Sequence, residues 1–285
     1  MGVLQGAALL SIAVTVAIVV ALAVPAIAFF REVSVGEFLT GDRWTPRFSG
    51  QESYGVLPLV TGTLWTTAIA LVIAVPFGLG AAIYLSEYAP ERVRKTLKPI
   101  LEVLAGIPSV VYGFFALAFV APVVLRDILN VPVGTFSVLA AGLVLGIMII
   151  PTVASLSEDA MTAVPSALRH GSLALGANKM RTTLRVVFPA AVSGIAASIV
   201  LAMSRAAGET MIVALAAGTQ PRMVAGPTQS GQTMTGFIAQ TATGESIPGT
   251  LSYNTLFAVG LLLFIITLII NIISIRLVRR FREAY

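Results

Sequence analysis

The stretch Val192–Gly218, VSGIAASIVLAMSRAAGETMIVALAAG, decides the fold class, because it is apolar and long enough to cross a lipid bilayer. Arg205 and Glu209 lie near its middle. A charged side chain at that depth costs roughly 2.5–3.5 kcal/mol on membrane-insertion scales, and charges kept there are functional by default. We therefore expect this span to carry the working residues of a membrane protein.

The composition of the whole chain supports this interpretation. Of 285 residues, 57% are hydrophobic and 11% are charged, whereas a soluble domain carries about 25% charged residues. The absence of cysteine and the single histidine exclude disulfides, thiolate metal sites and a histidine metal cluster. The net charge of +5 comes largely from short loops beside apolar spans, so it indicates membrane topology rather than nucleic-acid binding. We expect an all-α integral membrane fold in one domain, residues 1–285.

Six apolar spans predict six transmembrane helices. Glycine and proline interrupt the third at Gly106 and Pro108, and we expect the fourth to end at Pro151. Gly142 and Gly146 form a GxxxG pattern in the fourth, which either marks a close helix contact or arises by chance in a glycine-rich span. The spans are Val3–Phe30, Leu59–Leu85, Ile100–Leu125, Gly134–Ala154, Ala190–Gly218 and Thr255–Leu277.

The first span has two interpretations. Its Ala26-Ile27-Ala28 tripeptide resembles the cleavage site of a secretory signal peptide. However, the span has no basic n-region and is longer than the usual apolar region of a signal peptide, so we favour an uncleaved first helix.

The distribution of basic residues predicts the orientation in a bacterial plasma (inner) membrane. The segments 87–102 and 155–189 and the C-terminal tail hold twelve of the eighteen basic residues, whereas 31–58, 122–133 and 219–254 hold five. Because basic residues favour the cytoplasmic side, we place both termini and the first two segments in the cytoplasm. The segment 31–58 then lies outside, as an ordered loop that either connects two spans or touches an external partner.

The segment 155–189 is too long and too regularly patterned for a plain connection. Alanine and leucine recur at helical spacing in Ser157–Met161 and Ser166–Leu175, and Gly176 suits the end of the second helix. A further helix is expected from Lys179 to Pro189. Two short helices with apolar side chains and basic flanks then project from the membrane, which is typical of a docking element for another protein.

This loop resembles the cytoplasmic coupling loop of bacterial ABC-importer permeases. That family has a triplet EAA, a glycine four residues later and a hydrophobic–proline pair thirteen residues further on, which Gly176 and Phe188-Pro189 match. The triplet itself reads His170-Gly171-Ser172 here, so an ion pair of the family's glutamate does not carry over to His170. The resemblance implies an ABC type I importer transmembrane domain whose ATPase-coupling residues are Arg169, His170, Gly171, Ser172, Leu175 and Gly176.

Further stretches narrow the resemblance. Residues 106–113, GIPSVVYG, resemble a run of phosphate permeases, and residues 205–211, RAAGETM, resemble the RALGETM run of the PstC-type permease subunit of the bacterial phosphate ABC importer. The segment 257–283, with Asn271 and the tail RRFRE, is similar too. The resemblance covers about residues 56–285. It implies a first helix and external loop over 1–55 and a core ABC type-1 transmembrane domain over 56–279, with the coupling loop at 155–189.

The resemblance also implies partners. They are a PstA-type permease in a heterodimer, a PstB-type ATPase dimer that uses ATP-Mg, a PstS-type external phosphate-binding protein, and membrane lipid. The chain itself has no G-x-x-x-x-G-K-[ST] motif and no Ser/His/Asp constellation. We therefore expect no catalytic residue, no cofactor and no metal in this chain, and no nucleic-acid partner.

The chemistry of the central residues agrees with an anion path. Phosphate is an anion at neutral pH, and the guanidinium fork of Arg205 suits its oxygens. Glu209, at i+4, is expected on the same helix face. There it pairs with Arg205, or with a basic group of a partner subunit, and keeps phosphate binding weak enough for release. The alternative is a buried ion pair that only fixes helix packing. Ser204 and Thr210 are candidate hydroxyls along the path.

Other functions fit parts of the sequence. A permease for another oxyanion fits everything except the run at 205–211, and an autonomous secondary transporter has no use for the patterned loop at 155–189. A structural bundle has no use for the central charges. We expect alternating access driven by the ATPase, with the segment 157–176 as a nearly rigid lever.

Overall fold

The computed structural model describes residues 2–46, 50–244 and 247–280. Six of its helices are long and apolar enough to cross a membrane, as the sequence predicts. They are built from α1 (Gly2–Glu32), α3 (Leu57–Ile83) with η1 (Tyr84–Tyr88), α5 (Ser109–Phe115) with η2 (Ala116–Ile128), α6 (Val138–Thr162), α8 (Lys179–Thr182) with η3 (Thr183–Val187) and α9 (Phe188–Gly208), and α12 (Leu251–Arg280). Between them lie α2 (Val35–Thr40), α4 (Glu91–Ala105), α7 (Ser166–Ala174), α10 (Met211–Ala216) and α11 (Met234–Thr243).

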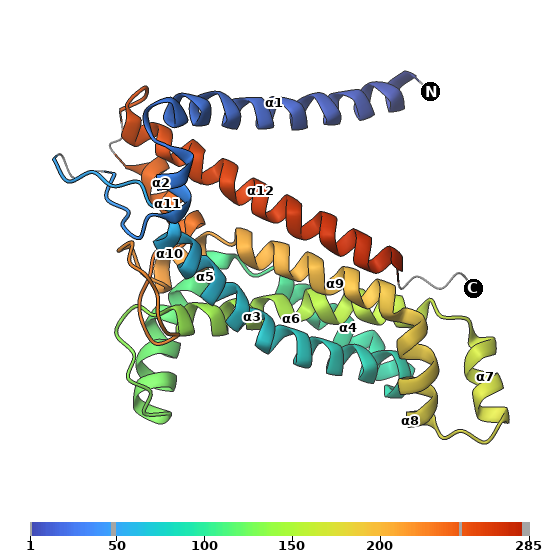
Figure 1. Cartoon of the computed structure of the whole chain (residues 1–285). Coiled ribbons are helices and arrows are strands. Elements are labelled where there is room, and N and C mark those ends of the chain that lie inside the picture. The colour runs from blue at the N-terminus through green and yellow to red at the C-terminus, as the bar shows by residue number, and fades with distance from the viewer. Residues whose placement is uncertain (1, 47–49, 245–246, 281–285) are drawn as a thin grey trace.

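The long helices form a bundle with two different ends (Figure 1). One end carries α7 and α8, and the opposite end carries α2, α10 and α11. The start of α1 and the end of α12 both lie at the α7 end, as the predicted same-side termini require (Figure 1). Which side of the membrane that end faces stays a prediction from the charge distribution. The tail residues Phe281, Arg282 and Glu283 lie outside the described residues.

Two predicted span boundaries are wrong. The third span does not run continuously from Ile100, because α4 ends at Ala105 and the membrane helix begins at Ser109, directly after the extended residue Pro108. The fourth span does not end at Pro151, because that proline is buried inside α6, which continues to Thr162. A helix tolerates proline where neighbouring helices compensate the lost hydrogen bond. Ser157–Met161 is therefore the last part of α6 rather than a separate short helix.

The GxxxG pattern in α6 marks a close helix contact. A methyl group at Gly142 would lie 2.7 Å from the Ile69 side chain, and one at Gly146 would lie 2.9 Å from the Ala70 carbonyl oxygen. Only glycine lets the backbones of α3 and α6 approach this closely. α6 thereby becomes the centre of the bundle, whereas α1 packs on the outside against α12.

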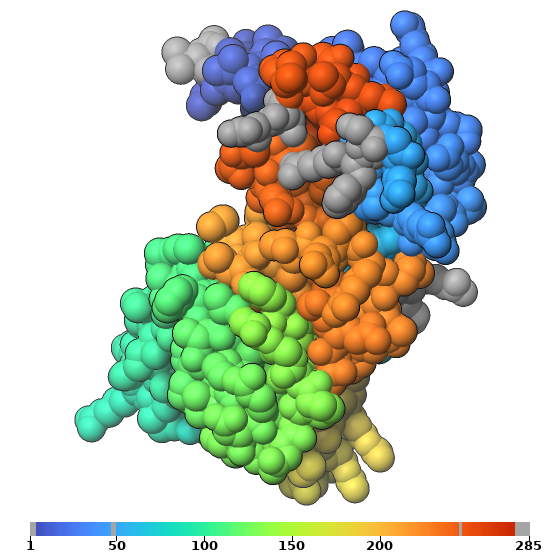
Figure 2. Space-filling model, turned by 90° about the vertical axis from the view of Figure 1, so that its left-hand side faces the viewer, coloured from blue at the N-terminus to red at the C-terminus, as the bar shows by residue number. Residues whose placement is uncertain are grey.

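The end opposite α7 is ordered by aromatic packing and by a loop that covers α6. Phe29, Phe38, Trp44 and Phe237 form a series of edge-to-face ring contacts, so the described part of the predicted loop 31–58 is ordered. Residues 217–233 lie over the start of α6, where the Val138 N–H donates to the Gln229 carbonyl at 2.9 Å. The first N–H groups of a helix need such acceptors. Figure 2 looks onto this end, which the described segments 33–46, 50–57, 128–137, 217–244 and 247–250 cover.

Candidate functional site

The fifth membrane span is broken beside its two charges. α9 ends at Gly208, Glu209 is extended with φ −64° and ψ 133°, and α10 begins at Met211. Glu209 is held in this conformation from both sides: its carboxylate accepts the Met211 N–H at 3.1 Å, and its carbonyl accepts the Thr235 hydroxyl at 2.6 Å. Glycine is a weak helix former, so Gly208 makes the break inexpensive.

The break changes the expected relation between the charges. The prediction that Arg205 and Glu209 share one helix face is wrong, because the helix ends between them. In the part of the chain that the structure describes, no ion pair joins Arg205 to a carboxylate. The carboxylate of Glu209 instead caps the start of α10. A pairing of Glu209 with a basic group of a partner subunit stays a prediction.

The Arg205 guanidinium lies near the middle of the bundle. Arg205 is exposed on this chain, and its Nη1 donates to the Thr152 hydroxyl at 3.2 Å. Thr152 is 14 residues after Val138 and 10 before Thr162, the two ends of α6. At about 1.5 Å per residue, these separations are roughly 21 and 15 Å. The guanidinium therefore lies well away from both ends of α6.

A second helix break lies beside the first. α4 ends at Ala105, α5 begins at Ser109, and the Tyr112 hydroxyl donates across the gap to the Leu104 carbonyl at 3.0 Å. α5 packs directly on α10, since a methyl group at Gly113 would lie 3.1 Å from the Ile212 Cα. Irregular backbone at membrane depth is tolerated where it is buried in protein or lines a polar cavity. Two such breaks in contact mark this region as the candidate site.

Tyr112 belongs to this site as well as to the break. Arg205 is close enough to interact electrostatically with the Tyr112 hydroxyl. Tyr112 lies in the run at 106–113, but its role was not predicted, and Thr152 was not identified as a site residue. Both come from other helices, so no spacing within Val192–Gly218 could have found them.

The two candidate hydroxyls point to different neighbours. Ser204 donates to the Asn271 side-chain oxygen at 2.8 Å, which ties α9 to α12. Thr210 donates to the Gly208 carbonyl at 3.3 Å within the break. Asn271 is a polar residue in an apolar span, and that contrast was the available signal for its role.

Within the coupling loop, α7 is the described helix that is separate from the membrane spans, and it lies at the far end of the bundle. Gly176 adopts φ +82°, a left-handed conformation that suits glycine after a helix end, as predicted. His170, Gly171 and Gly176 are exposed, and Leu175 is 91% exposed. The Ser172 hydroxyl instead bonds the Thr182 hydroxyl at 2.9 Å. The outer surface of α7 is thus free for contact in this chain.

Arg169 points into the protein. Its Nη2 lies 2.9 Å from Glu87 Oε1, and further N–H groups donate to the carbonyl oxygens of Met161 and Val164. Only 7% of the Glu87 side chain is exposed. Arg169 was predicted as an ATPase-coupling residue, and the geometry makes it a link between α7 and η1.

A buried carboxylate holds α4 against α6. Glu158, in α6, is 1% exposed and forms ion pairs with Arg94 and, at 2.7 Å, with Lys98. Lys98 also contacts Asp159 at 2.6 Å. These two hydrogen-bonded partners, Asp159 first, raise the pKa of Lys98. Both cations are on α4, so the helix before the break is anchored to the centre of the bundle.

Comparisons with known proteins give the chain its relatives. The family described as "Binding-protein-dependent transport system inner membrane component" matches residues 74–283. The probable ABC transporter permease protein YqgH of Bacillus subtilis is 39% identical over 94% of this chain and 88% of its own length. Phosphate transport system permease protein PstC 1 of Mycobacterium tuberculosis is 37% identical over 85% and 81%. A bacterial ABC transporter involved in alginate import has a chain with a similar fold, with TM-score 0.62, 16% identity and coverage of 93% and 96%.

Proposed function

This chain is an ABC-importer permease of the binding-protein-dependent transport system inner membrane component family, of the phosphate (PstC) type, and we propose that Arg205 contacts phosphate on its way through the membrane. The transporter is driven by ATP that a separate subunit hydrolyses. The observation that carries the proposal is the exposed guanidinium at mid-depth, beside two broken helices.

An exposed arginine at this depth requires a polar neighbour. An arginine that faced lipid at the bilayer centre would be costly, and such residues face a bundle interior or a water-filled cavity. The face of this chain that carries Arg205 therefore borders a second subunit, which we assign as a PstA-type permease. The path for phosphate then runs between the two permeases, and both helix breaks adjoin it.

The chemistry of Arg205 suits brief contact with phosphate. A guanidinium has five N–H donors, and the bond to Thr152 uses one of them. The remaining donors fit the oxygens of an anion. A single cation attracts phosphate without the multiple charges of a high-affinity site, which allows the anion to leave. Ser204 and Thr210 add hydroxyls on either side along the path.

The role proposed for Glu209 does not require a direct ion pair with Arg205. Its bond to the Met211 N–H holds the break open in a fixed shape. Its negative charge, one residue beyond the end of the Arg205 helix, lowers the attraction of the region for anions. Glu209 thus tunes the path through its position rather than through contact with Arg205.

The coupling loop supplies the movement. We propose that a PstB-type ATPase dimer binds the exposed side of α7 and that ATP binding closes this dimer. α7 follows α6 after three residues and is bonded to η1 through Arg169 and Glu87. Movement of α7 is therefore transmitted to two spans of the bundle. It opens the opposite end of the bundle, which gives alternating access. There a PstS-type binding protein delivers phosphate.

The proposal is tested with the complete transporter in sealed vesicles. Phosphate-loaded binding protein is added outside, ATP is enclosed, and uptake of labelled phosphate is compared with uptake of sulfate delivered by its own binding protein. We expect uptake of phosphate alone, and only with ATP. Equal uptake of sulfate would overturn the substrate assignment, and uptake by this chain without an ATPase subunit would overturn the importer assignment.

A further inference from the structure

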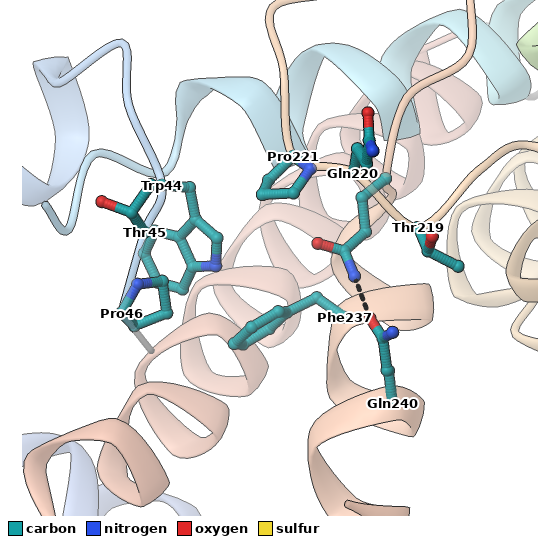
Figure 3. A pocket seen from close by; sticks show the side chains of 9 residues that line it. Trp44, Thr45, Pro46, Thr219, Gln220, Pro221, Phe237 and Gln240 are labelled. Atoms are coloured by element: carbon teal, nitrogen blue, oxygen red, sulfur yellow. Dashed lines mark hydrogen bonds between the residues drawn. The ribbon is translucent and has the colours of Figure 1, made fainter. Parts of the chain in front are cut away.

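A cavity of about 450 Å³ lies at the end of the bundle opposite α7. It opens between the segment after α2, the loop after α10, and α11 (Figure 3). Its walls combine aromatic and proline rings with amides and hydroxyls. The lining residues are Trp44, Thr45, Pro46, Thr219, Gln220, Pro221, Gln232, Phe237 and Gln240. None of these residues is charged, so the described lining offers no cation for a phosphate anion.

The aromatic wall is rigid. The Trp44 ring packs edge-to-face on Phe237, with ring centroids 5.1 Å apart, and on Phe38. Its backbone forms an antiparallel bridge with Tyr54. Trp44 and Phe237 are almost fully buried. A wall fixed in this way exists before any ligand arrives, which favours binding because little needs to be ordered.

Trp44 brings an unused hydrogen-bond donor to the cavity. Its indole Nε1 is buried and has no acceptor within the described residues. In Figure 3 the indole nitrogen lies on the side of the ring that faces the pocket. The other tryptophan differs, since Trp65 Nε1 donates to the Val224 carbonyl at 3.0 Å. Buried donors are nearly always paired, so the unpaired Trp44 N–H calls for an external acceptor.

Two glutamines provide a complementary donor and acceptor. Gln232 Nε2 donates to Gln240 Oε1 at 2.6 Å, the dashed line in Figure 3. This bond fixes both amides. It leaves the Gln232 oxygen as an acceptor and the Gln240 nitrogen as a donor. Neutral groups of both kinds beside aromatic and proline rings match main-chain peptide groups or an amide side chain.

We propose that this pocket binds an uncharged loop of the external binding protein, with Trp44 Nε1 donating to a carbonyl oxygen of that loop. The identity of the partner rests on the proposed function. The pocket lies at the end away from the ATPase-docking helix, where such a protein must arrive. Its chemistry selects a neutral polypeptide segment over the free anion.

The same pocket is connected to the candidate site. α11 supplies Phe237 and Gln240 to the wall, and its Thr235 holds the Glu209 carbonyl at 2.6 Å. The loop that supplies Thr219 and Gln220 directly follows α10. An occupant of the pocket therefore touches the two elements that hold the break beside Arg205. Docking of the binding protein and the shape of the path are coupled through this contact.

The test measures how strongly the binding protein acts on the complete transporter in lipid nanodiscs. The quantity is the concentration of phosphate-loaded binding protein that half-maximally stimulates ATP hydrolysis. Trp44→Phe keeps an aromatic ring against Phe237 and removes the N–H, and Gln240→Ala removes the amide at the exposed edge. We expect Trp44→Phe to raise this concentration roughly tenfold, the effect of losing a central interface contact, and Gln240→Ala, at the edge, to raise it less. Hydrolysis without binding protein should be unchanged.

The controls separate this inference from the proposed function. Gln51→Ala removes an exposed amide at the same end but outside the pocket lining, and should leave the concentration unchanged. Wild-type values for both pocket variants would overturn the docking site. Calorimetry with inorganic phosphate alone should show no binding in the pocket. Phosphate binding to the wild type that is lost in Trp44→Phe would also overturn the docking site. If only a sulfate-loaded binding protein stimulates ATP hydrolysis by the wild type, the phosphate assignment fails. The pocket variants, measured with that binding protein, then still test the docking site.

Discussion

Arg169 and Glu87 join the short helix α7 to the end of the second membrane span, with Arg169 Nη2 2.9 Å and Nε 3.1 Å from the same carboxylate oxygen. Arg169 also donates to the Met161 carbonyl at the end of α6. One side chain thus connects α7 to two spans that are distant in sequence. Because the pair is largely shielded from water, it is stronger than a surface ion pair. A force on α7 is transmitted to both spans.

Breaking this pair should uncouple ATP hydrolysis from transport. Arg169→Ala and Glu87→Ala each remove one partner, and we expect a loss of about 2–3 kcal/mol in the stability of the contact, below the range for a fully buried pair. Phosphate uptake per ATP hydrolysed should fall in both variants. The measurement is uptake and hydrolysis on the same vesicles.

The charge-swapped double variant Glu87→Arg with Arg169→Glu is the matched test of pairing. The double variant should recover more coupling than Glu87→Arg or Arg169→Glu alone, because the two side chains again carry opposite charges. Recovery is expected to be partial, since the carbonyl oxygens of Met161 and Val164 lose their donor. If the double variant is as defective as the sum of the single changes, the pair does not transmit the motion.

Gly176 should tolerate asparagine and reject valine. A Cβ there meets no atom within 4 Å, so the only obstacle is the backbone at φ +82°. Asparagine adopts this conformation several-fold more readily than other residues, whereas β-branched valine is strained by about 1–2 kcal/mol. Gly176→Val should weaken co-purification of the ATPase, and Gly176→Asn should preserve it.

Gly36→Ala is the control for that comparison, because it lies within the short helix α2 at the opposite end of the bundle, with open space around it. It should leave association unchanged. Normal ATPase association and uptake in Gly176→Val would remove the reason for placing the docking surface at the end of α7.

Tyr54 should titrate well above the ordinary range of a tyrosine hydroxyl. Burial, together with the hydrogen bond from its hydroxyl to Glu52, raises its pKa to about 12. The folded protein therefore holds this proton more tightly than the unfolded chain, where the pKa is about 10. The resulting stability is present below pH 10 and is lost as the pH rises toward 12. In a pH titration followed by tyrosinate absorbance, Tyr54→Phe should remove a step near pH 12. Loss of a step near pH 10 instead would contradict the assignment.

Gly113→Val should separate the two broken helices. The new Cβ would meet Leu215 Cδ1 at 2.9 Å and the backbone of Ile212 at 3.1 Å. A side chain can rotate away, but a backbone cannot, so overpacking of about 1–3 kcal/mol is expected. Phosphate uptake should fall although the transporter still assembles. Gly80→Ala, at a glycine with open space in α3, should have no effect. Unimpaired uptake in Gly113→Val would show that contact between the breaks is dispensable.

The sequence predicted the elements that depend on local pattern. The length and apolarity of the spans predicted six membrane helices, and Gly176 correctly predicted the end of α7. These features follow from hydrophobicity and backbone preference, which are properties of neighbouring residues.

The errors came from contacts between distant residues. Glu209 was placed on a continuous helix, but the break depends on Thr235, 26 residues later. The contact of Arg169 with Glu87, which precedes it by 82 residues, was not predicted. Pro151 was expected to end a helix that its buried surroundings maintain. No spacing within one segment reveals such partners, because they arise from the packing of whole helices.

The most direct test of the account is phosphate uptake by vesicles that contain the complete transporter with Arg205→Ala. Arg126→Ala is the matched control, because Arg126 is an exposed arginine near the end of the bundle that contacts only its neighbour Asp127 at 3.7 Å among the described residues. We predict that Arg205→Ala lowers uptake at least roughly tenfold, with Arg205→Lys intermediate, since lysine keeps the charge but not the fork. The control should transport normally. Wild-type uptake by an assembled Arg205→Ala transporter would contradict the proposed phosphate path.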